Sequence, residues 1–282
     1  MLAQAPGSTS NLGPGFDVLG LALSLYVRVE VLSAPKLVVR TEGEGADLPQ
    51  DETHLAARVA CAVAGHDQLE IRVQSEIPLG RGLGSSAALA LAAAAAAGAT
   101  DPLAVAAGSD GHAENAGASL YGGLVAATFV DGAPVVAPLR LDPSLSFVVL
   151  VPERRLETSA ARAVLPATIP FADGVFNLGR LGLLLSGLAE ADHLLPVAGE
   201  DRLHQKARGA LFPEAAELLA ALREGGARVA TWSGAGPSLL GICVGRADAG
   251  RARDAGEEAL ARLGVPGRSL VLAPDTIGLV TE

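Results

Sequence analysis

The chain is poor in several residue types that mark particular classes of protein. Among its 282 residues are two cysteines, Cys61 and Cys243, and aromatic side chains make up only 3%. Two isolated cysteines exclude a disulfide framework or a cysteine zinc cluster and are typical of free buried thiols. Lysine occurs only at Lys36 and Lys206. No lysine therefore follows a glycine-rich loop, which excludes the Walker phosphate-binding motif.

Membrane, secretion and nucleic-acid signals are also missing. The most apolar window, residues 83–99, is mostly alanine and falls short of the roughly 20 strongly apolar residues that a membrane span needs. The N-terminus has no basic stretch followed by an apolar core, so we expect no secretion signal and a cytoplasmic location. The formal net charge of −10 disfavours nucleic acid and anionic membranes as partners.

What the chain has in abundance is small and aliphatic residues, with 50% hydrophobic residues overall. The alternation of polar and apolar residues predicts strands at 18–32, 36–41, 69–75, 123–130, 145–151, 238–244 and 268–273. Helical patterns and caps predict helices at 51–64, after Asp101-Pro102, and at 157–164, 174–190, 200–210, 213–224 and 248–263. After residue 152 the predicted elements change from mostly strands to a series of short helices. We therefore expect an α+β protein with an N-terminal domain at 1–152 and a C-terminal domain at 153–282.

The most informative stretch is a glycine-rich loop that leads into an alanine-rich run. Alternate glycines let the backbone turn several N–H groups toward one point, and the alanines favour a helix directly behind them. A glycine loop at a helix N-terminus is suited to a phosphate group. A glycine-rich turn before a buried helix is the alternative. The candidate phosphate-binding loop comprises Pro78, Leu79, Gly80, Arg81, Gly82, Leu83, Gly84, Ser85, Ser86, Ala87 and Ala88.

Three further segments gather polar residues. Residues 6–17 lead into the predicted strand and carry Asn11 and Asp17. The segment is rich in Ser, Asn, Gly and Pro, a composition that is also typical of a disordered terminus. Residues 109–123 place two carboxylates beside His112 and Asn115. One of those carboxylates, with a hydroxyl of the glycine loop, would suit Mg²⁺; a solvated loop is the alternative. Residues 231–241 form a second glycine turn that could close over phosphates or be an ordinary β-turn.

Taken in order, these segments resemble the GHMP kinase superfamily and, within it, the homoserine kinase branch. The motifs that carry the resemblance are residues 10–17, 78–88 and 234–238, together with Gly111-His112-x-x-Asn115, Thr158-x-x-x-Arg162 and Asp201-x-Leu203-His204-Gln205-x-x-Arg208. The resemblance spans almost the whole chain. It implies an N-terminal domain like ribosomal protein S5 domain 2, a ferredoxin-like C-terminal domain, ATP between them, and a homodimer.

The resemblance also implies roles for individual residues. Asp17 would face the substrate ammonium, and Arg162 and Arg208 would face its carboxylate, with Asp17 and Arg162 as the catalytic candidates. The implied amino-acid pocket is lined by Asn11, Asp17, His112, Asn115, Thr158, Arg162 and Arg208. The implied nucleotide contacts are residues 78–88 with Gly234, Ala235 and Gly236. Ser86 and Asp110 would hold Mg²⁺; the superfamily commonly has a glutamate where this chain has Asp110, so we expect the shorter side chain to reach the ion through water.

The implied reaction is transfer of the γ-phosphoryl group of ATP to the hydroxyl of L-homoserine. Phosphoryl transfer depends mainly on in-line positioning and charge neutralisation, which the N–H groups of residues 80–86, Mg²⁺ and Arg81 would supply. We expect catalysis without a dedicated base, since Asp17 would be paired with the ammonium. The alternatives are a kinase for another small alcohol, such as mevalonate, and a non-catalytic ligand-binding member.

Overall fold

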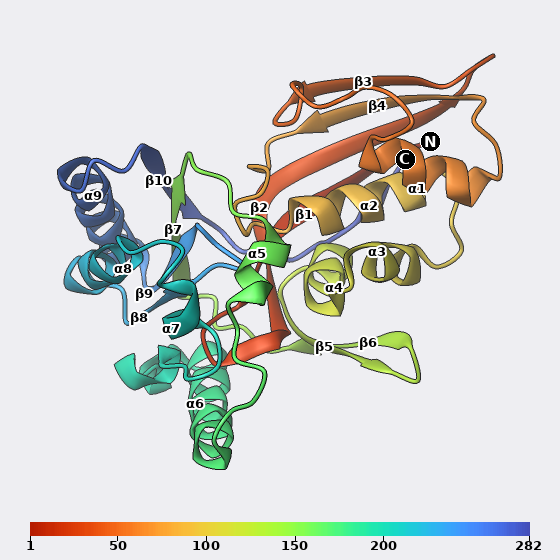
Figure 1. Cartoon of the computed structure of the whole chain (residues 1–282). Coiled ribbons are helices and arrows are strands. Elements are labelled where there is room, and N and C mark those ends of the chain that lie inside the picture. The colour runs from red at the N-terminus through yellow and green to blue at the C-terminus, as the bar shows by residue number, and fades with distance from the viewer.

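The computed structural model describes residues 1–282, except for the side chain of Asp110, which lies outside the described residues. The chain is built on two β-sheets (Figure 1). In the larger sheet the strand order is β11-β1-β2-β4-β3, and β5 and β6 extend from β2. The strands are β1 (Leu2–Asn11), β2 (Gly15–Ser33), β3 (Val38–Gly43), β4 (Leu69–Ser75), β5 (Leu124–Val130), β6 (Ala133–Leu139) and β11 (Val280–Thr281). All pairs are antiparallel except β3 with β4.

Four helices pack against the large sheet (Figure 1). They are α1 (Leu55–Ala64), α2 (Ser85–Ala96), α3 (Pro102–Asp110) and α4 (Ala113–Tyr121). The alanines of α2 are almost all buried, and they let this helix lie close to β1 and β2 because their side chains are small. Asp101 caps α3 by accepting from the N–H of Ala104, with proline in the first turn.

The smaller sheet is antiparallel, with strand order β10-β7-β9-β8. Its strands are β7 (Leu145–Pro152), β8 (Val229–Trp232), β9 (Leu239–Val244) and β10 (Gly267–Leu272). Alternate residues of β7 enter different cores: Val148 and Leu150 pack with α8 (Ala215–Glu224) and α9 (Arg246–Arg262), whereas Phe147 and Val149 join the large core. This period of two is what a strand covered on both faces requires.

The remaining helices lie around the junction of the two sheets (Figure 1). They are α5 (Thr158–Ala163), α6 (Phe171–Ala189) and α7 (Gln205–Arg208), with 3-10 turns at Ala191–His193 and Pro196–Gly199. None of the helices in the described part of the chain combines the length and the apolar character needed to cross a bilayer.

The architecture confirms the two-domain α+β expectation, with differences in detail. Residues 2–11 form a strand inside the large sheet, so the polar N-terminal segment is an ordered part of the fold. The sequence pattern did not predict β1, β6, α4 and β11. The division at residue 152 stays a prediction; β7 already belongs to the smaller sheet, and the C-terminal residues return to pair with β1.

Candidate active site

A polar pocket lies where the glycine loop, the β1–β2 turn and the start of α4 meet α5, α7 and the 233–236 turn. Its lining includes residues more than 200 positions apart in the chain, such as Asn11 and Gly234. The lining residues are Ser10, Asn11, Asp17, Gly80, Gly82, Leu83, Gly84, Ser85, Ser86, His112, Glu114, Asn115, Leu156, Glu157, Thr158, Arg162, Arg208, Gly234 and Ala235.

One wall of the pocket is the glycine loop at the N-terminus of α2. Gly80, Gly82 and Gly84 have φ values of 63°, 70° and 65°, as the sequence predicts for alternate left-handed residues. A Cβ atom at Gly84 would overlap Ser8 Oγ, and one at Gly82 would overlap the carbonyl oxygen of Ser233. Only glycine fits these positions. The first N–H groups of α2 have no partner within the helix, and they add the positive end of the helix dipole to this wall.

Arg81 does not extend this wall into the pocket. Its Nε donates to the carbonyl oxygen of Pro152 (2.9 Å) and its Nη2 to that of Glu153 (2.7 Å). A third donor, Nη1, reaches the carbonyl oxygen of Leu79 (3.2 Å). Arg81 therefore ties the loop to the end of β7 rather than presenting its charge to the pocket.

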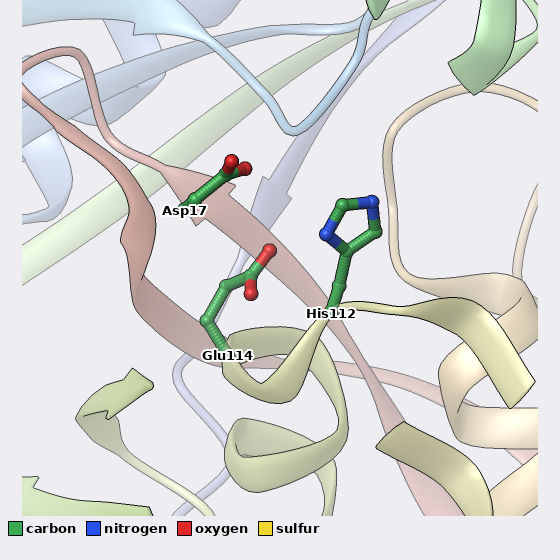
Figure 2. A group of neighbouring side chains, drawn as sticks. All are labelled: Asp17, His112 and Glu114. Atoms are coloured by element: carbon green, nitrogen blue, oxygen red, sulfur yellow. The ribbon is translucent and has the colours of Figure 1, made fainter. Parts of the chain in front are cut away.

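The opposite wall carries charged side chains. Arg162 Nη2 donates to Asp17 Oδ1 at 2.7 Å and lies 3.2 Å from Nδ1 of His112. Asp17, His112 and Glu114 each offer a ligand atom within 4.8 Å of the others, and Figure 2 shows these three side chains turned toward a common space. Glu114 and His112 come from the start of α4, Asp17 from β2 and Arg162 from α5.

The turn that carries Asp17 is held by unusual backbone geometry. Asn11 and Asp17 have positive φ values of 71° and 56°, a region that residues other than glycine rarely adopt. The Asn11 amide stabilises this turn: its Oδ1 accepts from the Asp17 N–H (2.9 Å), and its Nδ2 donates to the carbonyl oxygen of Gly234 (2.8 Å). Asn11 thus positions Asp17 and links the β1–β2 turn to the 233–236 turn.

A second amide fixes the base of the pocket. Asn115 Oδ1 accepts from Ser8 Oγ (2.9 Å), and its Nδ2 donates to Ser10 Oγ (3.1 Å) and to Glu114 Oε1 (3.2 Å). Asn115 and Glu114 are both buried. The side-chain carboxylate of Glu114 is therefore oriented by its neighbour in a region with little water.

Arg208 is the most deeply buried cation of the pocket, with 2% of its surface exposed. Burial lowers its pKa to about 10, so it stays charged at neutral pH. Asp201 lies beneath it at the start of α7 and accepts from the N–H groups of Leu203, His204 and Gln205. Burial alone would raise the pKa of Asp201, but His204 and these hydrogen bonds outweigh it and lower the pKa.

The structure brings the predicted amino-acid-pocket residues together in this one pocket. From the predicted nucleotide loop Gly80 and Gly82–Ser86 line it, as do Gly234 and Ala235. Pro78, Leu79, Arg81 and Gly236 lie outside the lining, and Ala87 and Ala88 are buried in the core. Of the predicted metal pair, Ser86 lines the pocket, and the Asp110 side chain lies outside the described residues.

Sequence reasoning missed Glu114 as a pocket residue. The signal was present, because residues 109–123 hold two carboxylates. The prediction assigned the one at Asp110 to a metal and left the other unassigned. Glu114 and Asn115 lie in the first turn of α4, and both residues line the pocket.

Two family models match the chain. Residues 53–123 match the sequence model of the GHMP kinases N terminal domain, and residues 177–262 match that of the GHMP kinases C terminal domain. The chain belongs to the GHMP kinase family. Members of this family are ATP-dependent kinases, so ATP is the nucleotide that this enzyme uses.

Full-length relatives of this GHMP kinase include homoserine kinases. That of Moorella thermoacetica is 38% identical over 99% of both chains. That of Clavibacter michiganensis is 40% identical, over 99% of this chain and 93% of the relative. The crystal structure of homoserine kinase from Cytophaga hutchinsonii superimposes with a TM-score of 0.86 at 26% identity, covering 99% of this chain and 96% of the other.

Proposed function

We propose that this GHMP kinase transfers the γ-phosphoryl group of ATP to the side-chain hydroxyl of L-homoserine, giving O-phospho-L-homoserine for threonine biosynthesis. One observation carries the proposal: a backbone phosphate cradle faces a charged amino-acid cluster across a single pocket. The full-length homoserine kinase relatives support the same assignment.

The charges of the cluster favour a zwitterion. Asp17 and Glu114 offer negative charge for an ammonium group, and Arg162 and Arg208 offer positive charge for a carboxylate. The Asp17–Arg162 ion pair at 2.7 Å would open to admit the substrate, with the ammonium joining Asp17 and the carboxylate joining Arg162. Mevalonate has no ammonium group, so nothing in it would replace Arg162 as the partner of Asp17 once this ion pair opens.

In this proposal the residues of the chain mainly bind and orient. The N–H groups of residues 80–86 hold the phosphates, and the arginines and carboxylates aim the substrate hydroxyl at the γ-phosphorus. Mg²⁺ would neutralise phosphate charge, held by Ser86 from the glycine loop and by Asp110 through water. The hydroxyl of Ser86 is exposed at the pocket, which fits an oxygen-seeking ion. No dedicated base is required.

The test is release of ADP with a panel of alcohols under Mg²⁺. L-Homoserine is expected to give the highest kcat/KM, with L-serine, L-threonine and mevalonate far behind. Phosphate should be found on the homoserine side-chain oxygen by ³¹P NMR. A preference for mevalonate would assign the chain to another branch of the family, and no ADP release above background would indicate a non-catalytic ligand-binding member.

We also propose that the enzyme is a cytoplasmic homodimer. Helix α6 supports the dimer, since Phe171, Val175 and Leu178 are 89%, 53% and 71% exposed along one face. Gly179 and Gly182 continue that face with open space above them, which would let a second α6 approach closely. Light scattering should give twice the 28.3 kDa chain mass, and Leu178→Glu should give the mass of one chain.

The two free cysteines support the proposed cytoplasmic location, because thiols stay reduced in that compartment.

A further inference from the structure

Arg208 has one guanidinium nitrogen fully engaged by the protein. Its Nη1 donates to the carbonyl oxygen of Gly234 at 2.8 Å and to Nδ1 of His204 at 3.0 Å. Its Nε–H is buried and has no acceptor among the described residues. Since Nη1 carries only two hydrogens, the edge left for a bidentate carboxylate is the one formed by Nε and Nη2.

The partners of His204 fix its tautomer. Nε2 lies 2.8 Å from the carbonyl oxygen of Gly13, which can only accept, so Nε2 carries the proton. Nδ1 faces a guanidinium nitrogen of Arg208, which can only donate, so Nδ1 presents its lone pair. The imidazole must therefore be neutral, with the proton on Nε2.

The surroundings of His204 keep it in this state. The ring is 99% buried and stacks on Phe16 with centroids 4.9 Å apart. Burial lowers its pKa to about 4; the nearby Asp201 and Asp17 carboxylates oppose this shift, and Arg208 adds to it. A second proton would place an N–H on Nδ1 against the Arg208 donor, so protonation and the present geometry are incompatible.

We propose that His204 is a positioning residue for substrate recognition: its Nδ1 lone pair holds Nη1 of Arg208 and so presents the Nε–Nη2 edge to the carboxylate of the amino-acid substrate. The assignment rests on the proposed function. The bond from His204 to Gly13 ties Arg208 to the β1–β2 turn that carries Asn11 and Asp17. This bond fixes the position of the carboxylate site relative to the ammonium site.

The lone pair can be tested with a pair of variants of nearly equal shape. His204→Asn keeps an acceptor oxygen near the place of Nδ1, whereas His204→Leu has the same branching and no acceptor; both lose the bond to Gly13. The Leu variant should raise the KM for L-homoserine about 10-fold above that of the Asn variant, the usual size for a lost hydrogen bond to a charged group. We expect kcat and the KM for ATP to agree between the two variants.

A control separates positioning from general destabilisation. Leu222→Ala removes a fully buried side chain of α8 that is not part of the pocket lining. It should lower Tm while leaving the KM for L-homoserine unchanged. In addition, ¹⁵N-histidine NMR of the wild type should show His204, identified among the five histidines by the loss of its signal in His204→Asn, as a neutral Nε2–H tautomer at pH 6.

The outcomes distinguish this proposal from the proposed function. A wild type that turns over L-homoserine, with equal KM values for the Asn and Leu variants, would overturn the role of His204 alone. A KM for L-homoserine that rises equally in Leu222→Ala would do the same, as would a cationic His204 at pH 6. A wild type with no homoserine turnover would overturn the proposed function and this assignment with it.

Discussion

The glycine loop and the charged cluster face each other across one pocket, yet they are built from different materials. The loop wall is formed by Gly80 and Gly82–Ser86, three of which are glycines without a side chain, and its one arginine is turned away toward Pro152 and Glu153. The opposite wall consists of the side chains of Asp17, Glu114, Arg162 and Arg208. A backbone cradle suits a phosphate chain that every family member must bind, whereas side chains can be exchanged to fit one alcohol.

The largest effect is expected from breaking the loop wall. In Gly82→Ala the new Cβ would overlap the Ser233 carbonyl oxygen at a residue with φ 70°, so the loop must change shape. Losing preorganised N–H donors should cut kcat/KM for ATP by about 100-fold or more. Gly98→Ala is the control, because its φ is also positive and nothing lies near its Cβ. Equal activity of the two variants, measured by ADP release, would contradict a backbone cradle.

A smaller loss is expected at the charged wall from Arg208→Lys. The lysine keeps the charge but cannot offer two parallel N–H groups to a carboxylate. We expect kcat/KM for L-homoserine to fall about 30-fold or more, as is usual when one partner of a buried charged pair is impaired. Steady-state kinetics at saturating ATP is the measurement. The KM for ATP should be unchanged; if it rose in parallel, the two walls would not be independent.

Asp17→Asn tests whether Asp17 acts in substrate binding or in the chemical step. Loss of the negative charge should raise the KM for L-homoserine about 10-fold, with kcat at saturation within about threefold of the wild type. The matched control is Asp131→Asn, an exposed aspartate on the β5–β6 turn that also has a positive φ (51°). A loss confined to kcat would identify Asp17 as a base instead.

The smallest effect at neutral pH concerns stability, because it grows only as the pH falls. His204 has a folded-state pKa of about 4, below the unfolded value of about 6.5. The folded state therefore binds fewer protons between these values, and stability falls as the pH drops from 6.5 to 4, by at most about 3 kcal/mol. His204→Asn should remove this part of the slope in urea titrations. An unchanged slope would mean that His204 titrates normally.

The two walls also differ in how far the sequence reveals them. Gly80, Gly82 and Gly84 lie within five residues directly before a helix, so local rules predict their conformation. The charged wall is assembled from β2, α4, α5 and α7, and no local rule brings Asp17 to Arg162. The family resemblance implied that both line one pocket, but the ion pair between them was not predicted. Glu114 was missed because its burial depends on α4. The polar residues at 109–123 are typical of a loop, so this helix was not predicted.

The fold shows the same limit. The alternating strand β4 was predicted with its observed bounds, 69–75. Strand β1 was not predicted, because residues 6–11 are small and polar, and they are buried by contacts with α2 and α4, which are distant in sequence. Tertiary contacts override local composition at such positions.

The most direct test is calorimetric titration of a non-hydrolysable ATP analogue with Mg²⁺ into the wild type, Gly84→Ala and Arg208→Lys. The account predicts binding to the wild type, an equal affinity for Arg208→Lys, and a loss of about 10-fold or more for Gly84→Ala, whose Cβ would overlap Ser8 Oγ. No heat with the wild type, or wild-type affinity in Gly84→Ala, would contradict the claim that main-chain amides of this loop hold the nucleotide.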